Sequence, residues 1–243
     1  MLETLLKRGR CGIIYKIESP AGALIRKKFS PSIPVKLWNW LFYTSPHPAS
    51  VEWGCHHAYW KRRLASRLSR YAAEGLHICD ALRMAENNDG FIARFIEGRA
   101  PERNEKKIVY QAVKKLEDFF DKIGMPTWSF CQKNPFSAAN FILCDKEIHI
   151  VDYEQSVPVP DARGAITYDV IYFKEVHRFM ESRRQELLDR LGAEEMKFLD
   201  EAFELARLYQ SRLDIKPRPW IAFCERKLKE RSRFPEKPFD RSQ

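Results

Sequence analysis

Alternation of apolar and polar residues near the start of the chain predicts a β-hairpin. The runs CGIIYKIE at 11–18 and ALIRKKF at 23–29 are rich in β-branched and aromatic residues. Between them, the sequence Ser-Pro-Ala-Gly at 19–22 has strong turn chemistry. We therefore expect two short strands joined by this turn.

The next segment, residues 31–48, is rich in prolines and aromatic residues, so we expect a loop or a short helix with an exposed aromatic face. A longer helix is predicted to begin near Ser50, a favourable N-cap, and to run through EWGCHHAYWKRRLASRL at 52–68. Two further strands are expected at 76–84 and 90–98, separated by a turn formed around Asn87 to Gly90.

An amphipathic helix is predicted over residues 104–123, because its apolar residues recur on one face. Gly124 and Pro126 end this helix. A short hairpin follows, with strands NFILC and EIHIVDY joined by a tight turn at Asp145 and Lys146.

The remaining sequence has the periodicity of amphipathic helices at 167–191, 194–213 and about 219–232, the first two hinged near Gly192. Strands thus dominate the first part of the chain and helices the rest. This order predicts an α+β fold, with a β-rich N-terminal lobe over residues 1–98 and a helical C-terminal lobe over residues 99–243.

Composition narrows the classes of protein. No window is apolar enough for a membrane-spanning helix, and the start MLETLLKRGRCG lacks the apolar run of a secretory signal, so a cytoplasmic location is expected. Six cysteines without a C-x-x-C pair argue against a disulfide framework or a zinc knuckle. The net charge of +9 suits nucleotide phosphates or an anionic membrane surface. Nucleic acid is the weakest of the candidate partners, since only the charge supports it.

Two local patterns carry candidate chemistry. Gly9 and Gly12, three residues apart beside strand-forming residues, allow a tight turn whose backbone amides can approach phosphate oxygens. Asn140 opens one short strand, and Asp152 closes the next one twelve residues later. Their oxygen atoms can converge on Mg²⁺, which prefers one or two such side chains together with nucleotide phosphates.

These patterns resemble the protein-kinase-like superfamily over roughly residues 7–175. Residues 9–16, GRCGIIYK, are similar to its glycine-rich loop, and NFIL…IHIVDYE is similar to its metal-binding hairpin, in the choline- and aminoglycoside-kinase branch. FIARFIEG looks like the segment that joins the two lobes, and Tyr168-Asp169 like the pair below the catalytic loop. Small bacterial members such as the lipopolysaccharide-core sugar kinases have a comparable size.

The resemblance implies a two-lobed protein-kinase-like fold that binds ATP and Mg²⁺. It also implies a phosphate-binding lysine on the second strand, paired with a glutamate of the next helix. Glu52 is the expected partner. Alternation favours Lys27, because it shares a strand face with Ile25, while Lys28 and Arg26 stay open as alternatives.

The sequence departs from the family at the catalytic loop, H-x-D-x-x-x-x-N, whose aspartate is the general base. Counting back from Asn140 places Pro135 at the aspartate position and Lys133 at the histidine position. With one inserted residue, Asn134 takes the aspartate position and Gln132 the histidine position. Neither proline nor a neutral amide acts as a general base. Asp161 or Glu154 is the candidate substitute for this base.

Three hypotheses follow. The first is an ATP-dependent phosphotransferase with a small-molecule or lipid-linked sugar acceptor. The second is a pseudokinase that binds nucleotide or serves as a scaffold. The third adds peripheral attachment to the inner face of the membrane through Trp38, Trp40, Leu41 and Phe42 beside Lys36 and the basic tail. The alternative to the third is that these aromatic residues pack under the N-terminal lobe.

Overall fold

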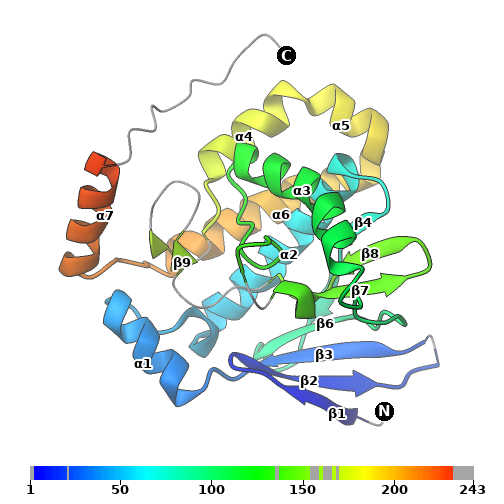
Figure 1. Cartoon of the computed structure of the whole chain (residues 1–243), viewed down its shortest axis with the longest axis horizontal. Coiled ribbons are helices and arrows are strands. Elements are labelled where there is room, and N and C mark those ends of the chain that lie inside the picture. The colour runs from blue at the N-terminus through cyan, green and yellow to red at the C-terminus, as the bar shows by residue number, and fades with distance from the viewer. Residues whose placement is uncertain are drawn as a thin grey trace.

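The computed structural model describes residues 3–20, 22–134, 137–153, 159–160, 166–167 and 170–231, and shows a mixed α+β protein with its main sheet near the N-terminus (Figure 1). Among the sequence positions singled out above, Pro135, Glu154, Asp161, Tyr168 and Asp169 lie outside the described residues. No described helix is both long enough and apolar enough to cross a membrane.

Five antiparallel strands form the N-terminal sheet, in the order β1-β2-β3-β6-β5. The predicted hairpin is confirmed as β2 (Gly12–Ile17) and β3 (Leu24–Phe29), and β6 (Gly90–Arg94) pairs with the other side of β3. The edge strand β1 (Glu3–Arg8) was not predicted. It is exposed along its whole length and carries an irregularity in its pairing, so its sequence lacks the alternation of a half-buried strand.

Two helices connect β3 to the rest of the protein. The aromatic segment forms α1 (Ile33–Phe42), with a proline in its first turn, as allowed for the expected short helix. A 3₁₀ turn, η1 (Pro48–Ser50), precedes α2 (Glu52–Ala72), so Ser50 ends that turn and Val51 is the N-cap residue of α2.

A second sheet has the order β4-β8-β7 and lies above the first in Figure 1. The predicted hairpin is confirmed as β7 (Phe141–Cys144) and β8 (Glu147–Ile150), and β4 (Leu76–Ile78) runs parallel to β8. The single strand expected at 76–84 is therefore wrong. The chain changes sheets at Asp80, whose carboxylate accepts a hydrogen bond from the backbone N–H of Ala81, and β5 (Ala81–Met84) joins the N-terminal sheet.

The C-terminal half is helical, as predicted, with α3 (Lys106–Ile123) ending at Gly124 in a left-handed conformation. The single helix expected at 167–191 is wrong, because the backbone at Arg183 leaves helical geometry and separates two helices. The remaining elements are η2 (Ser137–Asn140), β9 (Val159–Pro160), β10 (Ile166–Thr167), α4 (Phe173–Ser182), α5 (Arg184–Leu191), α6 (Ala193–Arg212) and α7 (Pro219–Arg231).

The two hydrophobic clusters share α2. Cys55 and Tyr59, in its first half, pack with Phe29 and Phe91 on the N-terminal sheet. Its second half enters the larger cluster, with residues of α3, β8, α4 and α6. The packing therefore does not follow the predicted boundary after Gly98, since α2 and β4 pack with the C-terminal helices.

The segment after β6 links the two sheets. The backbone groups of Arg99 and Leu143 exchange two hydrogen bonds, N to O distances 3.0 and 2.8 Å, which fasten this segment to β7. A side chain at Gly98 would place its Cβ 2.4 Å from the carbonyl oxygen of Leu143, so the close approach requires glycine. Arg99 also binds the Glu105 carboxylate through two hydrogen bonds of 2.6 Å. Arg99 thus fastens this segment to β7 through its backbone and to Glu105, just before α3, through its side chain.

A buried histidine of α2 makes folding stability depend on pH. Burial and the nearby Lys61 ammonium lower the pKa of His57 to about 3, and its Nε2–H donates to Oε1 of Gln210 at 3.1 Å. The pKa of His57 in the folded protein lies below its ordinary value of 6.5, so the unfolded chain binds the extra proton. This contribution to stability is complete above pH 6.5 and falls by about 1.4 kcal/mol per pH unit below it.

We expect His57→Gln to lose this part of the pH dependence. The difference in the free energy of unfolding between wild type and variant, from urea titrations, should change by about 1.4 kcal/mol per pH unit between about pH 6 and 4. The exposed His177, replaced by glutamine, is the control and should follow wild type closely. A pH-independent difference for His57→Gln would contradict the assignment of a neutral buried ring.

Candidate functional site

An ion pair between β3 and the end of β8 is the centre of the candidate site. Nζ of Lys27 donates to Oδ1 of Asp152 at 2.7 Å, across 125 residues of sequence. The Lys27 side chain is only 11% exposed, whereas that of Asp152 is 47% exposed. The carboxylate is therefore open to solvent on one side while it neutralises a buried cation.

Strand alternation separates the three basic residues of β3. Arg26 lies on the opposite face, 3.0 Å from a carboxylate oxygen of Glu3, with its guanidinium over the Tyr15 ring. Lys28 pairs with Asp89 at 3.1 Å. Of the alternatives that the sequence left open, only Lys27 lies beside Asp152.

The expected pair between Lys27 and Glu52 does not form. The Glu52 carboxylate accepts a hydrogen bond from Asn88 at 3.1 Å and lies 3.6 Å from Nε2 of His56. Its place at the start of α2 directs it to the turn between β5 and β6 rather than to the buried face of β3. Asp152 takes the place of the predicted carboxylate partner.

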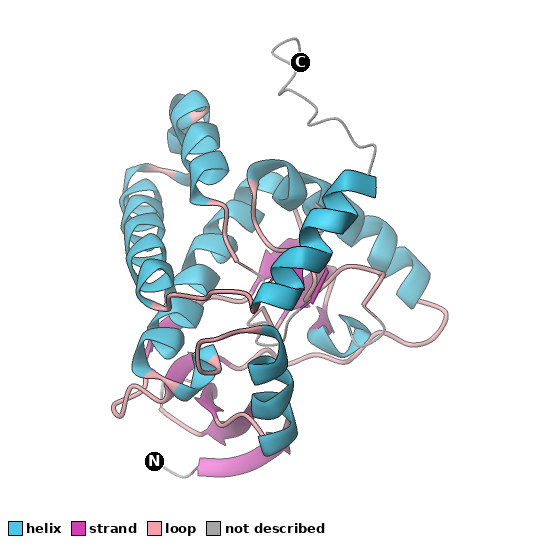
Figure 2. Ribbon diagram, turned by 90° about the vertical axis from the view of Figure 1, so that its left-hand side faces the viewer, coloured by secondary structure: helices cyan, strands magenta, loops and turns pink. Residues whose placement is uncertain are grey.

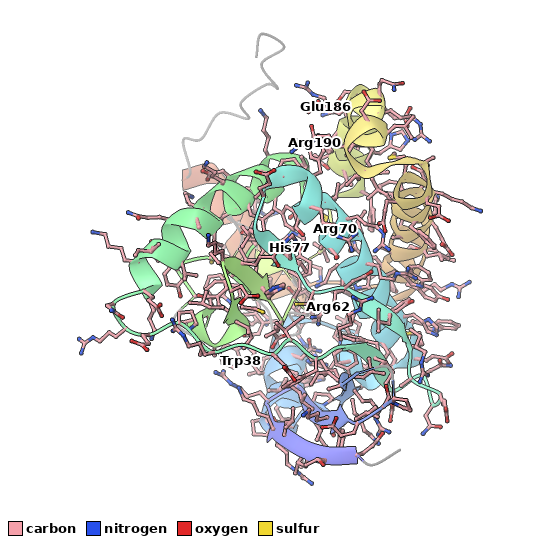
Figure 3. The ribbon with its side chains drawn as sticks, turned by 90° about the vertical axis from the view of Figure 1, so that its right-hand side faces the viewer. Trp38, Arg62, Arg70, His77, Glu186 and Arg190 are labelled. Atoms are coloured by element: carbon pink, nitrogen blue, oxygen red, sulfur yellow. The ribbon has the colours of Figure 1, made fainter. Side chains whose placement is uncertain are left out.

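Arg62 of α2 holds the backbone next to Asp152. Its Nη2 donates to the carbonyl oxygen of Val151 at 2.8 Å, and its Nε donates to the carbonyl oxygen of Cys79. The guanidinium also lies 5.1 Å from the centre of the Phe91 ring. Arg62 is 2% exposed and lies midway along α2, between the N-terminal sheet and the helices (Figure 3). It thereby connects α2, both sheets and the residue that precedes Asp152.

A third buried cation reaches the same segment. Lys61 is also 2% exposed, and its Nζ lies 5.4 Å from the centre of the Tyr153 ring. The hydroxyl of Tyr153 donates to the carbonyl oxygen of Pro126 at 2.8 Å, which fixes the ring. Lys27, Lys61 and Arg62 therefore contact the three successive residues Val151–Tyr153. Buried cations are rare unless an anion or a polar group compensates them, so three of them on one short segment distinguish it from the rest of the described core.

Asn140 and Asp152 lie at the same end of the β7–β8 hairpin. The backbone N–H of Val151 donates to the carbonyl oxygen of Asn140 at 2.8 Å, which places the two residues on adjacent strand ends. Nδ2 of Asn140 donates to the carbonyl oxygen of Ser129 at 2.6 Å. This hydrogen bond uses the amide nitrogen, so Oδ1 is the atom of Asn140 that could act as a metal ligand. Two oxygen donors fit Mg²⁺ that brings its own waters or phosphate oxygens.

The described residues contain no group of three or more His, Cys, Asp or Glu side chains arranged to hold a metal ion. A metal held by protein side chains alone therefore has no support in that part of the chain. A metal that arrives with a phosphate ligand needs fewer protein ligands.

The two glycines form the turn between β1 and β2. The N–H of Gly9 donates to the carbonyl oxygen of Gly12 at 2.8 Å, and the carbonyl oxygens of Arg10 and Cys11 accept from Ser32 and Ser30. Gly12 pairs with Phe29, two residues beyond Lys27 on β3. A Cβ at Gly12 would lie 2.7 Å from the carbonyl oxygen of Lys28, so glycine permits the close pairing of the two strands. The turn thus lies near the Lys27 end of the sheet.

Asn134 has structural contacts in the loop before η2. It is buried, its Nδ2 donates to the carbonyl oxygen of Trp128 at 2.9 Å, and its own carbonyl accepts from the Ser137 hydroxyl at 2.8 Å. The neighbouring Gln132 and Lys133 are exposed. Residues 127–134 and 137–140 contain no carboxylate and no histidine, so this described part of the loop offers no general base.

Sequence reasoning missed Lys61 and Arg62 as part of the site. They belong to the run WKRRLASRL, in which several basic residues follow one another within the predicted helix. A charged helix of this kind is normally solvated, so only burial distinguishes these two side chains from Arg70, which is partly exposed. A comparison of the chain with protein-family models and with curated protein sequences finds no match.

Proposed function

We propose that this chain binds ATP together with Mg²⁺ between β3 and the β7–β8 hairpin, in the manner of a protein-kinase-like nucleotide-binding domain. The observation that carries the proposal is the Lys27–Asp152 ion pair, with Lys61 and Arg62 buried on the adjacent residues. A buried lysine beside a half-exposed aspartate offers one group for phosphate oxygens and one for a metal ion.

Each residue has a defined part in this proposal. Lys27 binds phosphate oxygens, while Asp152 and Oδ1 of Asn140 hold Mg²⁺, which neutralises charge on the phosphates. Arg62 keeps the backbone before Asp152 in place, and the Gly9–Gly12 turn covers the phosphates. Glu52 and Lys28 take no part, since their partners are Asn88, His56 and Asp89.

The first candidate function is that of an enzyme that transfers a phosphoryl group from ATP to a small-molecule or lipid-linked sugar acceptor. Transfer depends mainly on positioning and on charge stabilisation, which the cations of this site supply. The second candidate is a pseudokinase, a nucleotide-binding or scaffolding module without turnover. The absence of a carboxylate from the described residues of the 127–140 loop favours this second candidate, because loss of a general base typically lowers the rate by about 10²–10⁴.

Adjacent lysines of β3 provide a matched test of nucleotide binding. Calorimetric titration with ATP and Mg²⁺ should show binding by wild type, and Lys27→Met should weaken it by about 10–100-fold, the effect of losing one charge-assisted hydrogen bond. Lys28→Met removes the same charge from the opposite face and should bind like wild type. No binding by wild type, or equal losses in both variants, would reject the proposed site. ATP consumption in the presence of Mg²⁺ and candidate acceptors then separates the kinase from the pseudokinase.

A further inference from the structure

The outer sides of α1 and α7 form an exposed apolar surface, here named the aromatic face. Figures 1 and 2 show the two helices on the same side of the molecule, although about 180 residues separate them. Six large apolar side chains compose the face, each between 47% and 59% exposed: Leu37, Trp38, Trp40, Leu41, Trp220 and Phe223. Contiguous exposed apolar surfaces of this kind mark sites of interaction.

Most of the large apolar side chains of α1 face solvent, whereas a helix that packs on a core buries them. Its buried residues are Val35 and Asn39, and Nδ2 of Asn39 donates to the carbonyl oxygen of Ser45 at 3.2 Å. A polar side chain is thus turned inward, while Trp38 and Trp40 are turned to solvent. The alternative that the aromatic residues pack under the N-terminal lobe is therefore wrong for these two tryptophans.

Specific contacts hold α1 and α7 together. Nε1 of Trp220 donates to the carbonyl oxygen of Leu41 at 3.0 Å, and the rings of Phe42 and Trp220 lie 5.4 Å apart. The Arg218 guanidinium lies 4.3 Å from the centre of the Trp40 ring. The face is therefore ordered before it meets a partner, which lowers the entropy lost on binding.

The charge around the aromatic face is positive. No aspartate or glutamate occurs between Glu18 and Glu52, so α1 and its flanking loops carry no acidic residue. Lys36 and Arg226 are exposed on the two helices. Residues 224–243 contain seven lysines and arginines and four acidic residues. The described cations beside the face, together with the excess of basic residues in the C-terminal sequence, are complementary to an anionic partner.

We propose that the aromatic face docks on the surface of an anionic lipid bilayer, with α1 and α7 in the headgroup region. Tryptophan suits this region because its ring is apolar and its N–H is polar, and lysine and arginine reach lipid phosphates from the same depth. A second copy of the chain is a poor partner, because pairing would bring together two faces that both carry an excess of cations. This inference does not rest on nucleotide binding.

Co-sedimentation of the full chain with vesicles tests the inference. Wild type should bind vesicles of phosphatidylcholine mixed with phosphatidylglycerol, should bind pure phosphatidylcholine much more weakly, and should be released by salt. The double variant Leu37→Ser with Trp40→Ser should lower the partition coefficient at least about tenfold, because two apolar side chains no longer enter the headgroup region. The matched control is Leu82→Ser with Ile108→Ser, which removes two exposed apolar side chains from elsewhere and should bind as wild type.

The charge-reversal variant Lys36→Glu with Arg226→Glu provides a second test that leaves the apolar residues intact. It should lose most of its preference for anionic vesicles. Three results would overturn the inference: no sedimentation of wild type with anionic vesicles, equal binding by the serine double variant and wild type, or salt-insensitive binding to both vesicle types. A monomer–dimer equilibrium in analytical ultracentrifugation that the serine variant abolishes would assign the face to self-association instead.

Discussion

Replacement of Asp152 by asparagine is expected to weaken the binding of ATP in the presence of Mg²⁺ by about 10–100-fold and to remove the benefit of Mg²⁺ itself. The asparagine keeps the size of the side chain but loses the charge that attracts the metal and holds Lys27. One charge-assisted interaction is worth about 1.5–3 kcal/mol, which corresponds to this range of dissociation constants. Titrations with ATP, with and without Mg²⁺, measure both effects.

Asp145 provides the matched control for Asp152. It lies in the turn between β7 and β8 with a φ of 53°, a backbone conformation that asparagine tolerates well. Asp145→Asn should therefore fold and bind nucleotide as wild type does. If Asp152→Asn kept a wild-type response to Mg²⁺, Asp152 would not be a metal ligand and the proposed site would fail at its centre.

The second large effect is expected for Arg62→Met, which should lower the free energy of unfolding by about 2–5 kcal/mol. The variant removes the Arg62 donor from the carbonyl oxygen of Cys79, in a buried hydrogen bond, and from that of Val151, in a part-buried one, and a buried group that loses its partner costs about 1–3 kcal/mol. The loss also includes the contact between the guanidinium and the Phe91 ring. Denaturant titration of the purified variant measures the change.

Arg70→Met on the same helix is the control for Arg62. Its side chain is 41% exposed and pairs with Glu195 at 3.4 Å, so its loss should cost at most about 1 kcal/mol. Similar costs for the two variants would mean that the contacts of Arg62 with both sheets contribute little. A Lys replacement at position 62 keeps the charge but lacks the planar fork, and should recover only part of the loss.

The sequence predicts elements well where one face of the element is buried. The helix α3 has clear periodicity, because every third to fourth side chain enters the core, and the hairpins of β2–β3 and β7–β8 are half-buried or buried along their strand-forming runs. β1 has no buried residue, so its pattern carries no such signal. The division of residues 76–84 between two sheets depends on the partner strands, β8 and β6, which no local pattern reveals.

The candidate site was predicted only in part, because some of its features are local in sequence and others depend on residues far apart in the chain. Alternation along β3 separates Lys27 from Arg26 and Lys28, and this separation is local. The carboxylate that meets Lys27 is not local: Glu52 is near in sequence but binds Asn88, whereas Asp152 reaches Lys27 across 125 residues of sequence. The burial of Lys61 and Arg62 likewise depends on elements distant in sequence.

The parallel pairing of β4 with β8 has a consequence for the order in which the chain folds. Residues 76–78 meet residues 148–150, and α2 packs most extensively on α6, which ends at residue 212. During synthesis, the N-terminal sheet can form early from neighbouring strands, but the second half of α2 exposes Leu64 and Leu68 until α6 emerges. The apolar side of α2 around Leu64 and Leu68 therefore stays uncovered by α6 until residue 212 has emerged, and we expect chaperones at the ribosome to bind there.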